Sequence, residues 1–92
     1  MALNFEWDDK KAKSNLLKHK ISFEEASTVF GDDLSITIED PLHSKDENRL
    51  ILIGRSTNYK TLIVVHIEQL NSIRIISARK ATKIEQNFYE ES

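Results

Sequence analysis

The sequence predicts an α+β fold with the element order βααββββα, in which one antiparallel sheet is packed by helices. Segments with helical spacing and N-cap residues occupy both ends of the chain. Between them, the pattern changes to alternating or continuously apolar segments that are typical of strands. The later strand segments are joined by only a few residues, which favours antiparallel hairpins. Ninety-two residues are enough for one core, so we expect a single domain over residues 1–92.

Two helices are expected in the first third of the chain. Asp8 is a suitable N-cap for an amphipathic helix that runs to about Lys18. Ser22 and Glu25 have capping-box spacing, because a side-chain oxygen at the first position and a carboxylate three residues later can satisfy free backbone N–H groups. They open a second helix, which we expect to end near Phe30.

The remaining elements are strands and one terminal helix. The expected strands cover residues 5–7, 34–39, 49–55, 60–68 and 72–78. Residues 34–39 alternate strictly between apolar and polar side chains, and the later strands are rich in Ile, Val and Leu. A polar loop at residues 40–48 separates these two groups. Thr82 and Glu85 repeat the capping-box spacing, so a last helix should run to about Glu91.

The formal net charge of -2 conceals an uneven distribution of charge. Residues 1–48 hold six Lys/Arg and eleven Asp/Glu, residues 49–83 hold seven and one, and residues 84–92 hold none and three. The middle block is thus strongly basic between two acidic segments. This asymmetry indicates an anionic partner or an acidic protein partner, with an ordinary solvated surface as the alternative.

Composition also narrows the classes of protein. The chain has no cysteine, so a disulfide framework and a thiolate metal site are excluded. The three histidines show no metal-ligand spacing, and we expect neither a metal nor another cofactor. No apolar run approaches the ~20 residues that span a bilayer, and the N-terminus lacks a signal-peptide core. We therefore expect a cytoplasmic protein without a membrane partner.

The hairpin registers decide which polar side chains share a face of the sheet. We assign a three-residue turn at residues 69–71 and a four-residue turn at residues 56–59, since these lengths keep the apolar pairs together. His66 then lies opposite both Arg74 and Arg49, in a row across three strands. Adjacent strands are about 4.8 Å apart, so one phosphate could contact all three side chains.

Such a row suits the cleavage of RNA by its own 2′-hydroxyl. That reaction needs proton transfer and fixed positive charge on the developing phosphorane. His66 would be the acid or base, because the pKa of histidine lies nearest neutrality. Arg49 and Arg74 would hold the scissile phosphate with their forked donors. The alternative is a core histidine held by hydrogen bonds and arginines that are simply solvated at the edge.

Two groups of motifs carry a resemblance to a known family. They comprise Phe5–Asp8, Asn15, Lys18-His19 and Ile21–Ala26, followed by Ile53–Ser56, Val64–His66 and Ile73–Ala81. With these motifs the chain resembles the BrnT toxins over about residues 4–90. It departs from the family at Lys20, where family members usually carry a glycine after the histidine.

The resemblance implies a RelE-like fold and a ribonuclease toxin of a type II toxin–antitoxin system, which cleaves RNA to inhibit translation and growth. The expected partner is a BrnA-like antitoxin with a ribbon-helix-helix domain, and operator DNA would be bound only through that antitoxin. The enzyme would be a metal-independent endoribonuclease. The functional positions that it implies are catalytic His66, Arg74 and Arg49, and substrate-binding Arg55, Arg79 and Lys80.

Two other functions compete with this interpretation. The basic sheet face could belong to a non-catalytic module that only binds RNA or an acidic protein. Cleavage of purified RNA, as opposed to salt-sensitive binding without cleavage, separates the two. A direct DNA-binding regulator is the weaker alternative, because the sequence has no helix-turn-helix pattern and the expected helices at residues 23–30 and 82–91 are acidic.

Overall fold

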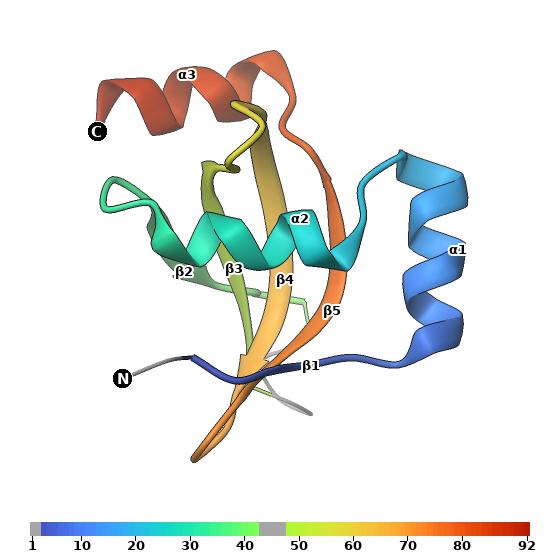
Figure 1. Cartoon of the computed structure of the whole chain (residues 1–92). Coiled ribbons are helices and arrows are strands. Elements are labelled where there is room, and N and C mark those ends of the chain that lie inside the picture. Colours follow the sequence, from blue (N-terminus) through green and yellow to red (C-terminus); the bar gives the residue numbers. More distant parts are fainter. Residues whose placement is uncertain (1–2, 43–47) are drawn as a thin grey trace.

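The computed structural model describes residues 3–42 and 48–92, which form one sheet with helices packed against it (Figure 1). The elements are β1 (Phe5–Glu6), α1 (Asp9–His19), α2 (Phe23–Thr28), the 3₁₀ helix η1 (Val29–Gly31), β2 (Ile36–Glu39), β3 (Arg49–Arg55), β4 (Thr61–Glu68), β5 (Ile73–Lys80) and α3 (Lys83–Glu91). The predicted fold class and element order are confirmed. Most of the expected polar loop, residues 43–47, lies outside the described residues.

The sheet has the strand order β1-β5-β4-β3-β2. Strands β2 to β5 are antiparallel, as predicted. Strand β1 instead pairs in parallel with the start of β5, where Phe5 lies opposite Ile73 and Glu6 opposite Arg74. The first strand of the chain thus forms the edge of the sheet beside the last strand, β5. The local sequence pattern does not indicate this long-range pairing.

The helix starts follow the predicted capping chemistry. The Asp8 carboxylate accepts hydrogen bonds from the backbone N–H groups of Lys10 and Lys11, and the Thr82 and Glu85 capping box is complete. At α2 only half of the box forms. The Ser22 hydroxyl accepts from the backbone of Glu25, but the Glu25 carboxylate accepts from the Ser56 hydroxyl at 2.8 Å and so ties α2 to the end of β3.

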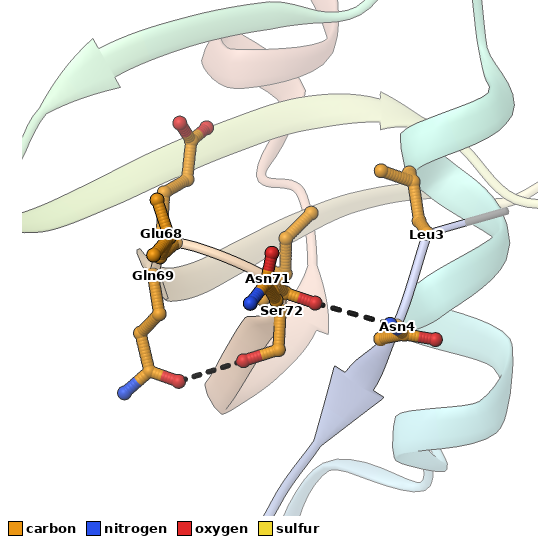
Figure 2. Close-up of a pocket in the computed structure, with 8 residues that line it drawn as sticks. Leu3, Asn4, Glu68, Gln69, Asn71 and Ser72 are labelled. Carbon is orange, nitrogen blue, oxygen red and sulfur yellow. Dashed lines mark hydrogen bonds between the residues drawn. The ribbon is translucent and has the colours of Figure 1, made fainter. Parts of the chain in front are cut away.

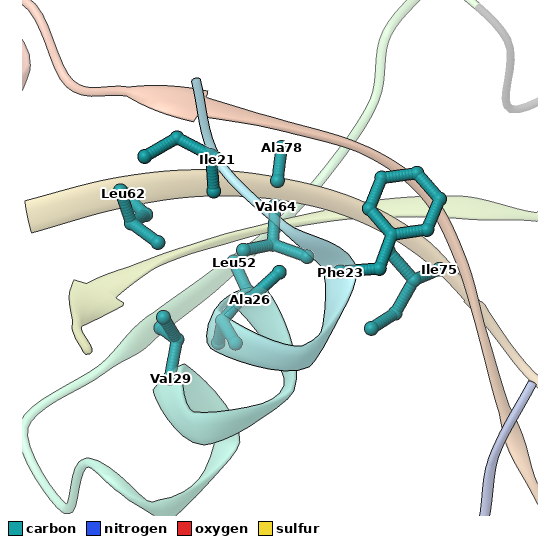
Figure 3. Packing of buried hydrophobic residues seen from close by; sticks show 9 residues of the cluster. All are labelled: Ile21, Phe23, Ala26, Val29, Leu52, Leu62, Val64, Ile75 and Ala78. Atoms are coloured by element: carbon teal, nitrogen blue, oxygen red, sulfur yellow. The ribbon is translucent and has the colours of Figure 1, made fainter. Parts of the chain in front are cut away.

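The two faces of the sheet differ in what covers them. One, here called the helix face, packs against α2 and its flanking segments (Figures 1 and 3). Its core consists of Ile21, Phe23, Ala26, Val29, Leu52, Leu62, Val64, Ile75 and Ala78. Full burial of one such side chain stabilises the fold by about 1.5–3 kcal/mol. Gly54 permits the close packing of β3, since a Cβ there would lie 2.8 Å from a methyl group of Val29.

The opposite face, here called the open face, carries Ile51, Val65 and Ile67, which alternate with the core residues of β3 and β4. Helix α3 covers only one end of it, where Ala81 and Tyr89 form a small second cluster with Ile53 and Ile63. The remaining apolar residues of this face are half-buried or exposed.

The register predicted for the β3–β4 hairpin was wrong by one residue. Arg55 lies opposite Thr61 and not Lys60, and the backbone N–H of Ser56 donates to Lys60 O at 2.8 Å. The turn therefore has three residues, 57–59. Tyr59 closes it in the left-handed region with φ 63°, the geometry that usually ends three-residue hairpin turns. Tyrosine is not a residue from which that conformation can be anticipated.

The register predicted for the β4–β5 hairpin was also wrong. Glu68 lies opposite Ile73 and not Ser72, so His66 lies opposite Ile75 and not Arg74. A β-bulge follows, because Val65 pairs with Ser77. One extra residue in β5 is accommodated there. Two adjacent isoleucines at positions 75 and 76 fit either face, which hides the bulge from pattern analysis.

The C-terminus of α1 stores backbone strain at Lys20. This residue has φ 62° and ψ 25°, and its N–H donates to Leu16 O. Because left-handed geometry costs an L-residue about 1–2 kcal/mol, we expect Lys20→Gly to raise the free energy of unfolding by ~0.5–1 kcal/mol. Urea denaturation measures this. Lys18→Gly, inside the last helical turn, is the matched control and should lower stability by a similar amount; a less stable Lys20→Gly protein would contradict the argument.

Candidate functional site

All four arginines of the chain lie on the open face. Side chains of directly opposed residues in a sheet share a face. Arg49 and Arg74 both lie opposite Ile67, whereas Arg55 lies opposite Thr61 and Arg79 opposite Ile63. These three partners alternate along β4 with Leu62, Val64 and His66, which point to the helix face. The arginines of the second half of the chain are thus concentrated on one side of the sheet.

Arg49, Ile67 and Arg74 form a row across β3, β4 and β5, here called the arginine row. Two strand spacings, roughly 10 Å, separate the backbones of the arginines. Long side chains extending from these positions can converge on one anion. Both arginines are half-buried, so part of each side chain packs on the apolar surface.

Glu6 extends this row, since β1 places it next to Arg74. Its side chain is exposed. We did not predict Glu6 as a site residue. The alternation of Phe5, Glu6 and Trp7 separates Glu6 from its apolar neighbours, but only the parallel pairing of β1 with β5 brings it beside an arginine.

Between the arginines the open face is apolar. Ile51, Val65 and Ile67 are half-buried, and Ile38 on the edge strand β2 is 42% exposed. Apolar surface flanked by forked cationic donors suits a ligand that is both anionic and partly flat, such as RNA. It suits an acidic protein segment equally well.

Arg79 is held by α3. Its guanidinium donates to the two carboxylate oxygens of Glu85 at 2.8 and 2.9 Å. These hydrogen bonds raise the pKa of Arg79 and lower the pKa of Glu85 to about 2. Arg79 therefore has a fixed direction, and part of its charge is balanced at the end of the open face that α3 covers.

This ion pair predicts an acid-sensitive contribution to stability. The folded pKa of Glu85 is about 2, below its ordinary value of 4.5, so stability is lost as the pH falls through that interval. The effect should be modest, because Arg79 and Glu85 side chains are 41% and 29% exposed. We expect that Glu85→Gln makes the urea midpoint of unfolding depend less steeply on pH between pH 4.5 and 2. Glu91→Gln should leave the plot of urea midpoint against pH as it is in the parent. Superimposable curves for Glu85→Gln and the parent would contradict the assignment.

Arg55 belongs to a contact between α3 and the 3₁₀ turn. Its guanidinium lies 5.7 Å from the centroid of the Tyr89 ring and 3.8 Å from the Glu90 carboxylate. The Tyr89 hydroxyl and the Arg55 backbone N–H both donate to Asp32. Burial alone would raise the pKa of Asp32, but these hydrogen bonds outweigh it and the pKa lies below its ordinary value.

His66 does not belong to the arginine row. It is 0% exposed, on the helix face, and its ring packs edge-on against Phe30 with 4.8 Å between centroids. Burial lowers its pKa despite Glu68, whose carboxylate lies 3.6 Å from Nε2. The predicted row Arg49–His66–Arg74 is therefore wrong, because the one-residue register shifts send His66 to the opposite face. The arginines themselves do share a row, as predicted.

Lys80 also lies apart from the arginines. It pairs with Leu62, so it belongs to the helix face, and its side chain is exposed. Sequence pattern placed Arg79 and Lys80 together because they are adjacent in the chain. In a strand, adjacent residues point to opposite faces.

A cleft of about 690 Å³ lies between the N-terminal residues Leu3 and Asn4 and the β4–β5 turn, and none of the four arginines lines it (Figure 2). Its polar groups bind one another, for example the Asn4 amide to Asn71 O. In residues 3–42 and 48–92 no group of three His, Cys, Asp or Glu side chains is placed to hold a metal ion. No helix in the same residues is long and apolar enough to cross a membrane.

Comparison with known proteins confirms the family resemblance. A family model for the ribonuclease toxin BrnT of type II toxin–antitoxin systems matches residues 7–85. The fold is similar to the crystal structure of the Brucella abortus ribonuclease toxin BrnT, with a TM-score of 0.69 and 19% sequence identity over 89% of this chain and 100% of that chain. Comparison with curated proteins gives no match. Since the family model spans most of the sequence, the chain belongs to the BrnT family of ribonuclease toxins of type II toxin–antitoxin systems.

Proposed function

We propose that the open face is the RNA-cleaving surface of this toxin, with the scissile phosphate held between Arg49 and Arg74. The observation that carries the proposal is the placement of all four arginines on this face. A guanidinium presents donors in a rigid fork that matches phosphate oxygens. Two of them on either side of Ile67 would stabilise the negative charge that develops on the phosphorane.

The proposed chemistry, without a metal ion, is attack of the neighbouring 2′-hydroxyl on the phosphorus. This attack breaks the bond to the 5′-oxygen, which takes a proton from water, and leaves a 2′,3′-cyclic phosphate and a 5′-hydroxyl. Glu6 is our candidate to accept the hydroxyl proton, since a carboxylate next to Arg74 can act as a general base. His66 takes no direct part in this scheme, because its ring is buried under Phe30. A role for His66 as acid or base would require it to reach the opposite face of the sheet.

The remaining basic residues have graded roles in the proposal. Arg55 and Arg79 lie on the same face at the end near α3, where they would guide the RNA backbone past the row. Ile51 and Val65 would lie beneath the bases or riboses. Lys80 is assigned only a general electrostatic role, because it belongs to the helix face.

Membership of a type II family implies an antitoxin partner. We propose that this partner is BrnA-like, that it carries a ribbon-helix-helix domain, and that it alone contacts operator DNA. We further propose that the toxin acts in the cytoplasm, where its RNA substrate is found. The support is the family membership.

The decisive experiment uses toxin freed of antitoxin and refolded, incubated in chelator with an RNA and with DNA of the same sequence. We expect cleavage of the RNA alone, with products that end in 2′,3′-cyclic phosphate and 5′-hydroxyl. Products with 3′-hydroxyl ends would rule out attack by the 2′-hydroxyl. Salt-sensitive RNA binding without any cleavage would favour a non-catalytic binding module.

A further inference from the structure

The shared face of Arg74 and Arg79 depends on an irregularity in β5. The two residues are five positions apart, so a regular strand would point them to opposite faces. The bulge between Ile75 and Ser77 removes this difference, because Ile76 is an extra residue that no residue of β4 opposes. Arg74 and Arg79 consequently lie opposite Ile67 and Ile63 on the open face.

The strand is fixed immediately after the bulge by the side chain of Asn15. Its Oδ1 accepts from the backbone N–H of Ala78 at 3.1 Å, and its Nδ2 donates to Ala78 O at 2.9 Å. Nδ2 also donates to Ile21 O at 3.0 Å, which anchors the amide to the segment between α1 and α2. Asn15 is only 7% exposed, so these hydrogen bonds are shielded from water.

The amide makes the pair of hydrogen bonds that a neighbouring strand would make. Strand β1 pairs with β5 only at Ile73 and Arg74, before the bulge. Beyond that point the Asn15 amide forms hydrogen bonds with the outer edge of β5, at the backbone N–H and C=O of Ala78. The bulge therefore lies between two anchors, β1 on one side and Asn15 on the other.

We propose that Asn15 is a positioning residue for RNA cleavage, which keeps Arg74 and Arg79 on one face by holding the bulge at Ile76. The proposal rests on the proposed function of the open face. Without Asn15, β5 is free to straighten or to shift its register, because bulged pairing is weakly specified when its anchors are lost. Either change rotates Arg74 away from Arg79, and a misplaced phosphate-binding group costs on the order of 10²-fold in rate.

The test compares Asn15→Leu, which removes all three hydrogen bonds, with Ser22→Ala. The Ser22 variant loses the hydrogen bond of 3.0 Å from Glu25 N at the start of α2. It therefore costs stability without removing either of the hydrogen bonds between Asn15 and β5. RNA cleavage and RNA binding of both variants are measured at a temperature at which circular dichroism shows that the variants are folded. For Asn15→Leu we expect a loss of kcat/KM on the order of 10²-fold. For binding of an uncleavable 2′-O-methyl RNA, we expect the slope of log Kd against log salt to fall by about 0.7 for each lost phosphate contact. Ser22→Ala should change neither.

Deletion of Ile76 should make RNA cleavage insensitive to Asn15→Leu. This result is not expected if Asn15 only stabilises the fold. Without this residue, Arg74 and Arg79 are four positions apart, so plain alternation places them on one face. In the Ile76-deleted protein, Asn15→Leu should therefore leave the salt slope and kcat/KM close to those of the deletion alone. If the deleted protein does not fold, Asn15→Asp takes its place, because it retains the acceptor for Ala78 N–H and loses both donated bonds. Because the carboxylate oxygen that replaces Nδ2 faces Ala78 O and Ile21 O, its activity should fall at least to that of Asn15→Leu, and since Asp has the size of Asn this result would assign the effect to the donated hydrogen bonds and not to side-chain volume.

Cross-strand amide NOEs between β4 and β5 report the bulge independently of RNA. Native NOEs in Asn15→Leu together with an unchanged salt slope would overturn the proposal. Displaced NOEs with unchanged RNA binding would keep the role of Asn15 in the bulge but reject the open face as the RNA site, so the two failures are distinguishable.

Discussion

Replacing Arg74 with alanine should lower kcat/KM for RNA cleavage by on the order of 10²–10³-fold and relieve growth arrest, while the protein stays folded. This is the usual cost of removing one donor that stabilises charge in a transition state. Arg74 is half-buried on the open face, and it is not part of either apolar cluster. Its removal should therefore affect the reaction much more than stability.

Arg49→Ala is expected to act in the same way, because Arg49 lies on the other side of Ile67. The double variant should lose less than the product of the two single losses, since both arginines would hold the same phosphate. Lys80→Ala is the matched control. It removes an exposed cation from β5 on the helix face and should retain most activity. Full activity of folded Arg74→Ala would remove the arginine row from the mechanism.

Replacing His66 should separate a role in the core from a role in chemistry. His66→Ala leaves a cavity beneath Phe30 and should lower the free energy of unfolding by about 2–4 kcal/mol. The whole free energy of unfolding of a domain of this size is only about 5–15 kcal/mol. Loss of toxicity in His66→Ala would therefore follow from unfolding, and that variant alone says little about catalysis.

His66→Leu is the informative variant. Leucine keeps most of the buried volume, and replacing a buried polar group with an apolar one of similar shape is often close to neutral. We expect it to fold and to cleave RNA at a rate similar to the parent, with urea denaturation as the check on stability. A folded His66→Leu protein with a loss of on the order of 10²-fold or more would restore His66 as acid or base.

Patterns within single segments determined the elements of this fold. Asp8, Ser22 and Thr82 each cap a helix as predicted, since a cap depends on a side chain and on backbone within three residues of it. The strands appear within a residue or two of their predicted ends for the same reason. The concentration of positive charge in the second half was likewise visible, and it marked the arginines that share the open face.

The tertiary structure alone decided which of these residues meet. Tyr59 in a left-handed conformation shortens one turn, and the shifted β4–β5 pairing with its bulge sends His66 to the helix face. Side-chain direction reverses with every residue of a strand, so an error of one position exchanges the two faces. The position of the bulge is fixed by Asn15, which contacts a residue 63 positions away. The sequence by itself therefore determined the elements and the cationic residues, whereas long-range hydrogen bonding decided that Ile67, and not His66, lies between Arg49 and Arg74.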